Sequence, residues 1–269
     1  MRYALYRCLY GEQFIQESIK SVIDHVDKVF VFWTNKPWGN TDRCIFKGEE
    51  VLFPDKFDNI LDRIKELDSP KIELVEAYTE SPFGQLTHFV NDILLERYDR
   101  PDTLVILEVD HVFREDQIVK ALNDFEAADY DCATTRQVEL WKTPKFRIPN
   151  RPSRCGTNFW NLSKLSNLPP TGTQGNISGM PVLDVDVHNF GFCESSKVMR
   201  WKHLTALAFS KEVGDSPPNE NWLDKWEAWS EDNQSKNLEV SLGCESNIPH
   251  ALPYNISELP SLVVEKYKL

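Results

Sequence analysis

The most constraining feature of this sequence is a repeated alternation of short apolar runs with helically spaced apolar residues. The first two runs are residues 3–8 and "KVFVFW" at 28–33, and the residues between them carry apolar side chains at helical spacing. The alternation returns with runs at 71–78 and 103–109, each followed by another helical stripe. This order predicts an α/β fold with a mostly parallel central sheet and helices on both faces.

The composition of the sequence changes from about residue 141. The segment 141–181 is rich in Pro, Gly, Asn and Ser and has few periodic positions, so we expect a long functional loop over about 143–180. A helix is expected at about 195–209. No internal repeat or low-complexity linker interrupts the chain, which favours a single domain over residues 1–269.

The net charge indicates the class of partner, and the cysteines indicate the cellular location. The formal net charge of -12 argues against nucleic acid or an anionic membrane as the main partner and favours a small ligand. No apolar run approaches the roughly 18 residues of a membrane span, and the first residues lack the apolar core of a signal peptide. Six scattered cysteines without a CxxC pair favour reduced thiols and a cytoplasmic location.

The stretch "LVILEVDHVFRED" places Glu108, Asp110 and His111 directly after an apolar run. In an open α/β sheet, ligands bind beyond the carboxyl ends of the strands. Alternate residues of an extended segment point the same way, so Glu108 and Asp110 can face one ion or one ribose. Their oxygens suit Mg²⁺ or Mn²⁺, which would neutralise a diphosphate. Solvated carboxylates at a strand end are the plainer alternative.

Two stretches of the first half carry a resemblance to a known family. "IQESIKSVI", preceded by Gly11-Glu12 and followed by Thr41-Asp42, resembles the opening of family-2 type glycosyltransferases with the glycosyltransferase-A fold. The helix that contains Asn91, followed by "DTLVILEVD", resembles the same family's region ending in its metal-binding DxD motif, here Glu108-Val109-Asp110. The resemblance covers about residues 3–125. Thr34 and Asn35 stand where the family has an acidic residue that meets the nucleotide base.

A second group of residues lies in "LDVDVHNFGFCESSKVMRWKH", residues 183–203, where Asp184, Asp186 and His188 alternate along an expected strand. This segment resembles an element found after the acceptor loop of several glycosyltransferase-A enzymes, in which the histidine can complete the metal site. A hydrogen-bonded structural histidine is the alternative. We expect Lys202, or its neighbour Arg200, to contact the diphosphate, although a helix-surface cation is more often only solvated.

The resemblance implies a role for each candidate residue. The donor nucleotide would be bound by Tyr10, Glu12, Thr34, Asn35, Asn91, Glu108 and Lys202. The metal, Mn²⁺ or Mg²⁺, would be held by Glu108, Asp110 and His188. The acceptor's proton would be taken by Asp186, or by Asp184 as second choice. The acceptor would meet Arg151, Arg154 and Trp160, of which the arginines could form forked hydrogen bonds and the tryptophan could equally be core.

The implied function is metal-dependent, inverting transfer of a sugar from a nucleoside-diphosphate sugar to a hydroxyl of a glycan or other acceptor. Residues of about 1–130 would bind the nucleotide sugar, about 131–230 would form the acceptor half, and 231–269 would be a C-terminal extension. A sugar-phosphate nucleotidyltransferase and a non-catalytic carbohydrate or nucleotide-sugar binding protein of the same fold stay open as alternatives. The oligomeric state is not indicated by the sequence.

Overall fold

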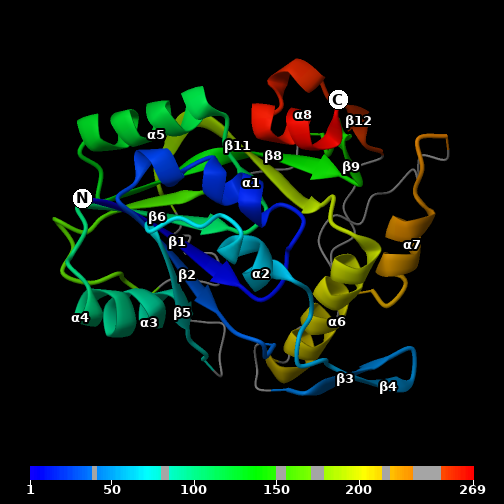
Figure 1. The fold of residues 1–269 in the computed structure, drawn as a ribbon. Helices are drawn as coiled ribbons and strands as arrows, with labels where there is room; N and C mark the ends of the chain where they lie inside the picture. Colours follow the sequence, from blue (N-terminus) through cyan, green and yellow to red (C-terminus); the bar gives the residue numbers. More distant parts are fainter. Residues whose placement is uncertain (38–40, 80–84, 150–155, 171–178, 214–218, 233–249) are drawn as a thin grey trace.

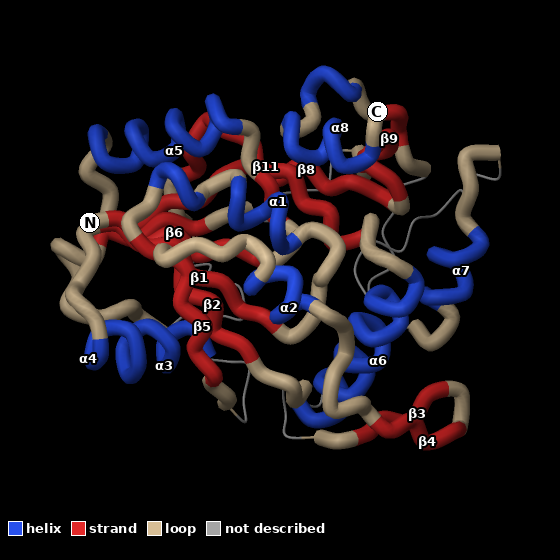
Figure 2. The backbone as a smooth tube through the Cα atoms, viewed as in Figure 1, coloured by secondary structure: helices blue, strands red, loops and turns tan. Residues whose placement is uncertain are grey.

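The structure is a computed structural model that describes residues 1–37, 41–79, 85–149, 156–170, 179–213, 219–232 and 250–269. Within these ranges most strands join one large sheet, with helices packed against it on both sides (Figure 1, Figure 2). The expected α/β class is confirmed, with a Rossmann-like arrangement of a central sheet between helices. No described helix is long and apolar enough to span a lipid bilayer.

The first half of the chain builds a parallel sheet in the order β5-β2-β1-β6. These strands are β1 (Arg2–Cys8), β2 (Lys28–Trp33), β5 (Ile72–Glu76) and β6 (Thr103–Glu108). The helices that connect them are α1 (Ile15–Lys20), η1 (Ile23–His25), α2 (Ile60–Lys65), α3 (Gln85–His88), the π-helical η2 (Phe89–Leu94) and α4 (Leu95–Arg97). The four strands predicted from apolar runs are therefore confirmed to within two residues.

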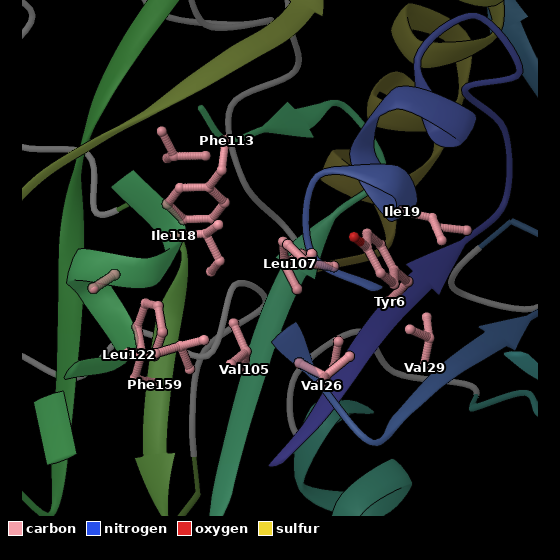
Figure 3. Packing of buried hydrophobic residues seen from close by; sticks show 14 of the residues in the cluster. Tyr6, Ile19, Val26, Val29, Val105, Leu107, Phe113, Ile118, Leu122 and Phe159 are labelled. Carbon is pink, nitrogen blue, oxygen red and sulfur yellow. The ribbon is translucent and has the colours of Figure 1, made fainter. Parts of the chain in front are cut away.

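Both faces of this parallel sheet are buried. One face packs against α1, α2 and α5 (Glu115–Ala127), and Figure 3 shows Tyr6, Leu107, Phe113, Leu122 and Phe159 meeting in that layer. The other face packs against α3 and η2. Each fully buried aliphatic or aromatic side chain contributes about 1.5–3 kcal/mol relative to exposure. This two-sided burial is why the strands appear in the sequence as continuous apolar runs.

The second half extends the same sheet with antiparallel and mixed pairing. Its strands are β7 (His111–Val112), β8 (Cys132–Trp141), β9 (Thr143–Arg147), β10 (Asn158–Asn161), β11 (Val182–Phe192) and β12 (Leu252–Pro253). β10 lies between β6 and β8 and is antiparallel to both. The expected long loop over 143–180 is therefore wrong in part, because β9 and β10 lie within it and Phe159 is fully buried in the core.

The remaining elements surround one end of the sheet (Figure 1). The hairpin of β3 (Arg43–Phe46) and β4 (Glu49–Leu52) packs against α6 (Ser196–Val213), which confirms the helix expected near 195–209. α7 (Trp222–Ala228) buries Trp222 and Trp226 in a cluster with the end of β11. The η3 turn (Ile256–Glu258) and α8 (Ser261–Tyr267) carry residues that pack on Phe14 and Phe190.

Candidate functional site

A cavity of about 480 Å³ lies at the carboxyl ends of β1 and β6, where ligands bind in open α/β sheets. Its walls come from segments far apart in the sequence: the ends of β1, β6 and β11 and one face of α6. On α6 the lining residues are Val198, Lys202, Ala206 and Phe209, whose spacing of three or four residues places them on one side of the helix. The sequence-predicted strand-end site is thus part of a real cavity.

Two ion pairs dominate the chemistry of this cavity. Arg7 lies opposite Glu108 in the parallel register of β1 and β6, and its Nη2 donates to Glu108 Oε1 at 2.6 Å. Lys202 of α6 donates through Nζ to Asp110 Oδ2 at 3.3 Å. All four residues line the cavity. The site therefore presents two carboxylates at the end of β6, each matched by a cation from another element.

The end of β11 also contacts the ion pair between Lys202 and Asp110. The carbonyl oxygen of Gly191 accepts a second hydrogen bond from Lys202 Nζ at 3.0 Å. A Cβ at Gly191 would lie 2.7 Å from Asp110 Oδ2 and 2.8 Å from Lys202 Nζ. A larger residue at this position would therefore have to displace the ends of both charged side chains.

Electrostatics keep Lys202 charged. Burial by itself lowers the pKa of Lys202, but the nearby Asp110, Tyr10 and Glu194 outweigh it and leave that pKa above its ordinary value. A charged lysine in a largely enclosed cavity suits an anionic ligand.

Glu194 is a third acidic residue of the cavity. It lies in the turn between β11 and α6, its side chain is 4% exposed, and neither carboxyl oxygen has a hydrogen-bond partner among the described residues. Burial raises the pKa of Glu194 to about 8, Asp110 acts in the same direction, and Lys202 opposes it. The neutral carboxyl is therefore the main form at neutral pH.

Glu194 is expected to make the protein less stable as pH rises. Its pKa lies near 8 in the folded protein against an ordinary 4.5, with Asp58, Asp110, Lys202 and Lys266 as the charged groups around it. The stability that the buried proton provides is fully present below about pH 4.5, and it is lost as pH rises through the folded pKa of about 8. Across this window the folded state holds a proton that the unfolded chain releases, so stability falls by at most about 1.4 kcal/mol per pH unit.

The measurement is urea unfolding of the wild type and Glu194→Gln at pH 5, 6, 7 and 8. Glutamine has no proton to lose, so the stability of Glu194→Gln relative to the wild type should increase steadily with pH. A difference that stays constant over this range would show that Glu194 titrates normally.

The resemblance of the sequence to glycosyltransferase-A enzymes implies a divalent metal, and the cavity's oxygen ligands can be compared with what such an ion needs. Each ion pair engages one carboxylate oxygen in the hydrogen bonds above, Glu108 Oε1 and Asp110 Oδ2. No group of three or more His, Cys, Asp or Glu within the described ranges is placed to hold an ion without help. Mg²⁺ characteristically binds one or two carboxylates together with substrate phosphates and water. Glu108 and Asp110 therefore fit a metal that arrives with a diphosphate.

Several residues predicted from the sequence meet in the cavity. Tyr10, Thr34, Glu108, Asp110 and Lys202 all contribute to its wall. The Tyr10 hydroxyl is 2.9 Å from Thr205 Oγ1 of α6, which links the end of β1 to that helix.

Three predicted nucleotide-binding residues do not line the cavity. Glu12 accepts the backbone N–H of Asn59 at 2.8 Å. Asn35 is exposed and borders a separate, smaller hollow. Asn91 donates through Nδ2 to the carbonyl oxygen of Leu168 at 2.9 Å, and its Oδ1 accepts the N–H of Leu168 at 2.7 Å. The side chains of Glu12 and Asn91 are thus engaged with backbone groups elsewhere in the fold.

The β11 residues Asp184, Asp186 and His188 also lie outside the cavity. Arg136 forms ion pairs with the exposed Asp184 and the half-buried Asp186. His188 is buried, with Nε2 at 2.9 Å from the Tyr254 hydroxyl. The cavity is lined instead by Asn189 and Gly191, the opposite parity of the strand. The predicted ligand His188 and the predicted bases Asp184 and Asp186 therefore lie away from the cavity that Glu108 and Asp110 line.

The predicted acceptor residues divide between two cases. Arg151 and Arg154 lie outside the described residues. Trp160 is 1% exposed and packs between β10 and the helices of the opposite face, so it cannot stack on an acceptor sugar.

Sequence reasoning missed Arg7 and Glu194. Arg7 sits inside an otherwise apolar strand, and a buried-strand arginine next to the strand's end was the available signal. Glu194 comes six residues after His188, but the neighbouring residues in the sequence give no sign that its side chain is buried.

Comparisons with known proteins found neither a matching family model nor a matching curated protein. Among solved structures, S. aureus TarS residues 1–349 in complex with UDP-GlcNAc aligns with 11% identity and a TM-score of 0.44, over 85% of this chain and 71% of that chain. The inositol-1-phosphate CTP transferase from T. maritima aligns with 11% identity and a TM-score of 0.41, over 74% of this chain and 94% of that chain. CMP:2-keto-3-deoxy-manno-octonic acid synthetase complexed with CTP aligns with 12% identity and a TM-score of 0.40, over 76% and 99%. These low values carry no argument about activity.

Proposed function

We propose that this protein is a glycosyltransferase that moves a sugar from a nucleoside-diphosphate sugar to a hydroxyl of a glycan or other acceptor, with inversion. The observation that carries the proposal is the pair of carboxylates at the end of β6, Glu108 and Asp110, each matched with a cavity-lining cation. A leaving diphosphate needs this combination of positive charge and metal-binding oxygen.

Each cavity residue then has a task. Lys202 and Arg7 bind and orient the diphosphate, and they release part of their contact with the carboxylates when it arrives. Glu108 and Asp110 would hold Mn²⁺ or Mg²⁺. Such an ion supplies Lewis-acid stabilisation of the charge that grows on the diphosphate. Tyr10 and Thr34 lie on the wall at the ends of β1 and β2, where a nucleoside would continue from the diphosphate.

The test is a donor panel. Thermal shift with UDP-, GDP- and dTDP-sugars, each with Mn²⁺ and with EDTA, should show one nucleotide class that stabilises the protein most when Mn²⁺ is present. The best donor is then incubated with mixed glycan acceptors, and sugar transfer is followed by mass spectrometry.

The alternatives are separated when the panel also includes nucleoside triphosphates with sugar phosphates. Formation of a nucleotide sugar from a nucleoside triphosphate and a sugar phosphate would identify a nucleotidyltransferase. Donor binding without transfer or hydrolysis, across the acceptor panel, would identify a binding protein. Absence of any nucleotide-dependent stabilisation would overturn the proposal.

A further inference from the structure

Glu194 is a buried carboxyl with no hydrogen-bond partner within the described part of the chain. Buried polar groups are nearly always hydrogen-bonded, because an unpaired one costs several kilocalories per mole of desolvation. Both carboxyl oxygens of Glu194 are shielded from solvent and lack a partner among the described residues, yet the side chain belongs to the cavity wall. A ligand group in the cavity is the natural partner of these oxygens.

Glu194 lies beside the elements that hold the two ion pairs. It lies two residues after the end of β11, whose Gly191 carbonyl holds Lys202, and it precedes α6, which carries that lysine. Its Oε1 also lies 3.5 Å from the position that a Cβ on Gly11 would occupy, next to Val109 of the Glu108-Val109-Asp110 segment. The carboxyl therefore adjoins the expected diphosphate site and is not engaged by either cation.

We propose that Glu194 is the catalytic base of the glycosyl transfer proposed above, and this inference rests on that function. An acceptor hydroxyl donates a hydrogen bond to an oxygen of ionised Glu194, the form whose share grows as pH rises toward about 8. As the acceptor oxygen forms its bond to the anomeric carbon, its proton passes to Glu194. The bond from that carbon to the diphosphate breaks and its electron pair leaves with the diphosphate. Attack from the face opposite the leaving group inverts the anomeric centre.

Other described acidic residues fit this role less well. Asp184 and Asp186 do not line the cavity, and both are paired with Arg136. Glu139 lines the cavity, but its Oε1 accepts from Gln137 Nε2 at 3.1 Å. Glu108 and Asp110 are engaged by cations, so Glu194 is the described cavity carboxyl with both oxygens unengaged.

The first test separates binding from transfer. Glu194→Gln preserves shape, so the Kd for the donor, measured by calorimetry, should stay within about threefold of the wild type. The transfer rate should fall by about 10²- to 10⁴-fold, the usual contribution of a positioned acid or base. Glu17→Gln is the matched control, because Glu17 is also buried but is bound by Lys266 outside the cavity. It should transfer sugar at the wild-type rate.

The second test asks for proton acceptance specifically. Azide is an anionic nucleophile that needs no base, so Glu194→Ala supplied with donor and azide should form the glycosyl azide, while Glu194→Gln without azide stays inactive. A structural role predicts no rescue by azide. If Glu194→Ala fails to fold, the same azide reaction is run with Glu194→Gln.

The outcomes distinguish this inference from the function on which it rests. A wild-type protein that binds no nucleotide sugar, or transfers none, overturns the proposed function itself. A transferring wild type with a fully active Glu194→Gln overturns only the role of Glu194. Donor binding with no azide product in either Glu194 variant also overturns it.

Discussion

Replacing Asp110 with asparagine is expected to remove the metal-dependent part of donor binding while leaving the fold intact. Asparagine keeps an oxygen that can accept from Lys202, but it lacks the charge that a dication needs. The gain in nucleoside-diphosphate affinity on adding Mn²⁺ should drop by about 100-fold or more, since even groups that only support a ligand cost 10- to 100-fold. The free energy of unfolding should change by only about 1–2 kcal/mol, because Asp110 lies beyond the end of a core strand.

Calorimetric titration of a nucleoside diphosphate with Mn²⁺ and with EDTA measures this effect, and urea unfolding measures stability. Asp186→Asn is the informative comparison. The alternation in the sequence predicts that this variant loses transfer, whereas its exposed ion pair with Arg136 predicts wild-type behaviour. If Asp110→Asn retains the full Mn²⁺ effect, Asp110 is not a metal ligand.

Replacing Lys202 with methionine is expected to weaken metal-free binding of a nucleoside diphosphate by about 10- to 100-fold, which corresponds to about 1.4–2.8 kcal/mol. Methionine preserves the apolar stem but removes the cation that the Asp110 carboxylate and the Gly191 carbonyl hold in place. Lys202→Arg should not restore binding, because the close approach of Gly191 leaves little room for the larger guanidinium. Removing the lysine also leaves Asp110 without its partner, so the variant is expected to be less stable.

The matched control is Arg200→Met on the same helix. Arg200 is exposed and lies over the ring of Phe46, so its removal should leave diphosphate affinity unchanged. A double-mutant cycle of Lys202→Met with Asp110→Asn should be non-additive, because the two side chains contact each other. Equal loss of affinity in Lys202→Met and Arg200→Met would indicate a long-range charge effect and contradict a direct contact by Lys202.

The local pattern of the sequence determined the parallel half of the fold and one edge of the site. Strands of the first half appear as apolar runs because helices cover both faces of the sheet. Each strand shows this pattern in its own residues, without reference to its neighbours. Glu108 and Asp110 were recognisable for a related reason. A polar pair directly after a buried strand lies at the carboxyl edge of the sheet, whatever the rest of the chain does.

The tertiary structure alone decided the strand β10 and the partners of the two carboxylates. β10 is only Asn158–Asn161, in a segment with the composition of a loop, and it becomes a strand because β6 and β8 supply hydrogen bonds on both sides. Arg7 meets Glu108 through the register of β1 with β6, which pairs residues 101 positions apart in the chain. Local periodicity carries no information about such pairings.

The same distinction explains why the β11 residues predicted for the site do not line the cavity. The alternation of Asp184, Asp186 and His188 correctly indicated that they share one face of a strand, because side chains alternate with a period of two. Which face meets the cavity depends on pairing with β8 and β7 and on the C-terminal Tyr254, which contacts His188. With these contacts in place, Gly191 lines the cavity and the predicted residues do not. A period of two determines which residues lie together, but only packing against distant segments decides which side becomes the site.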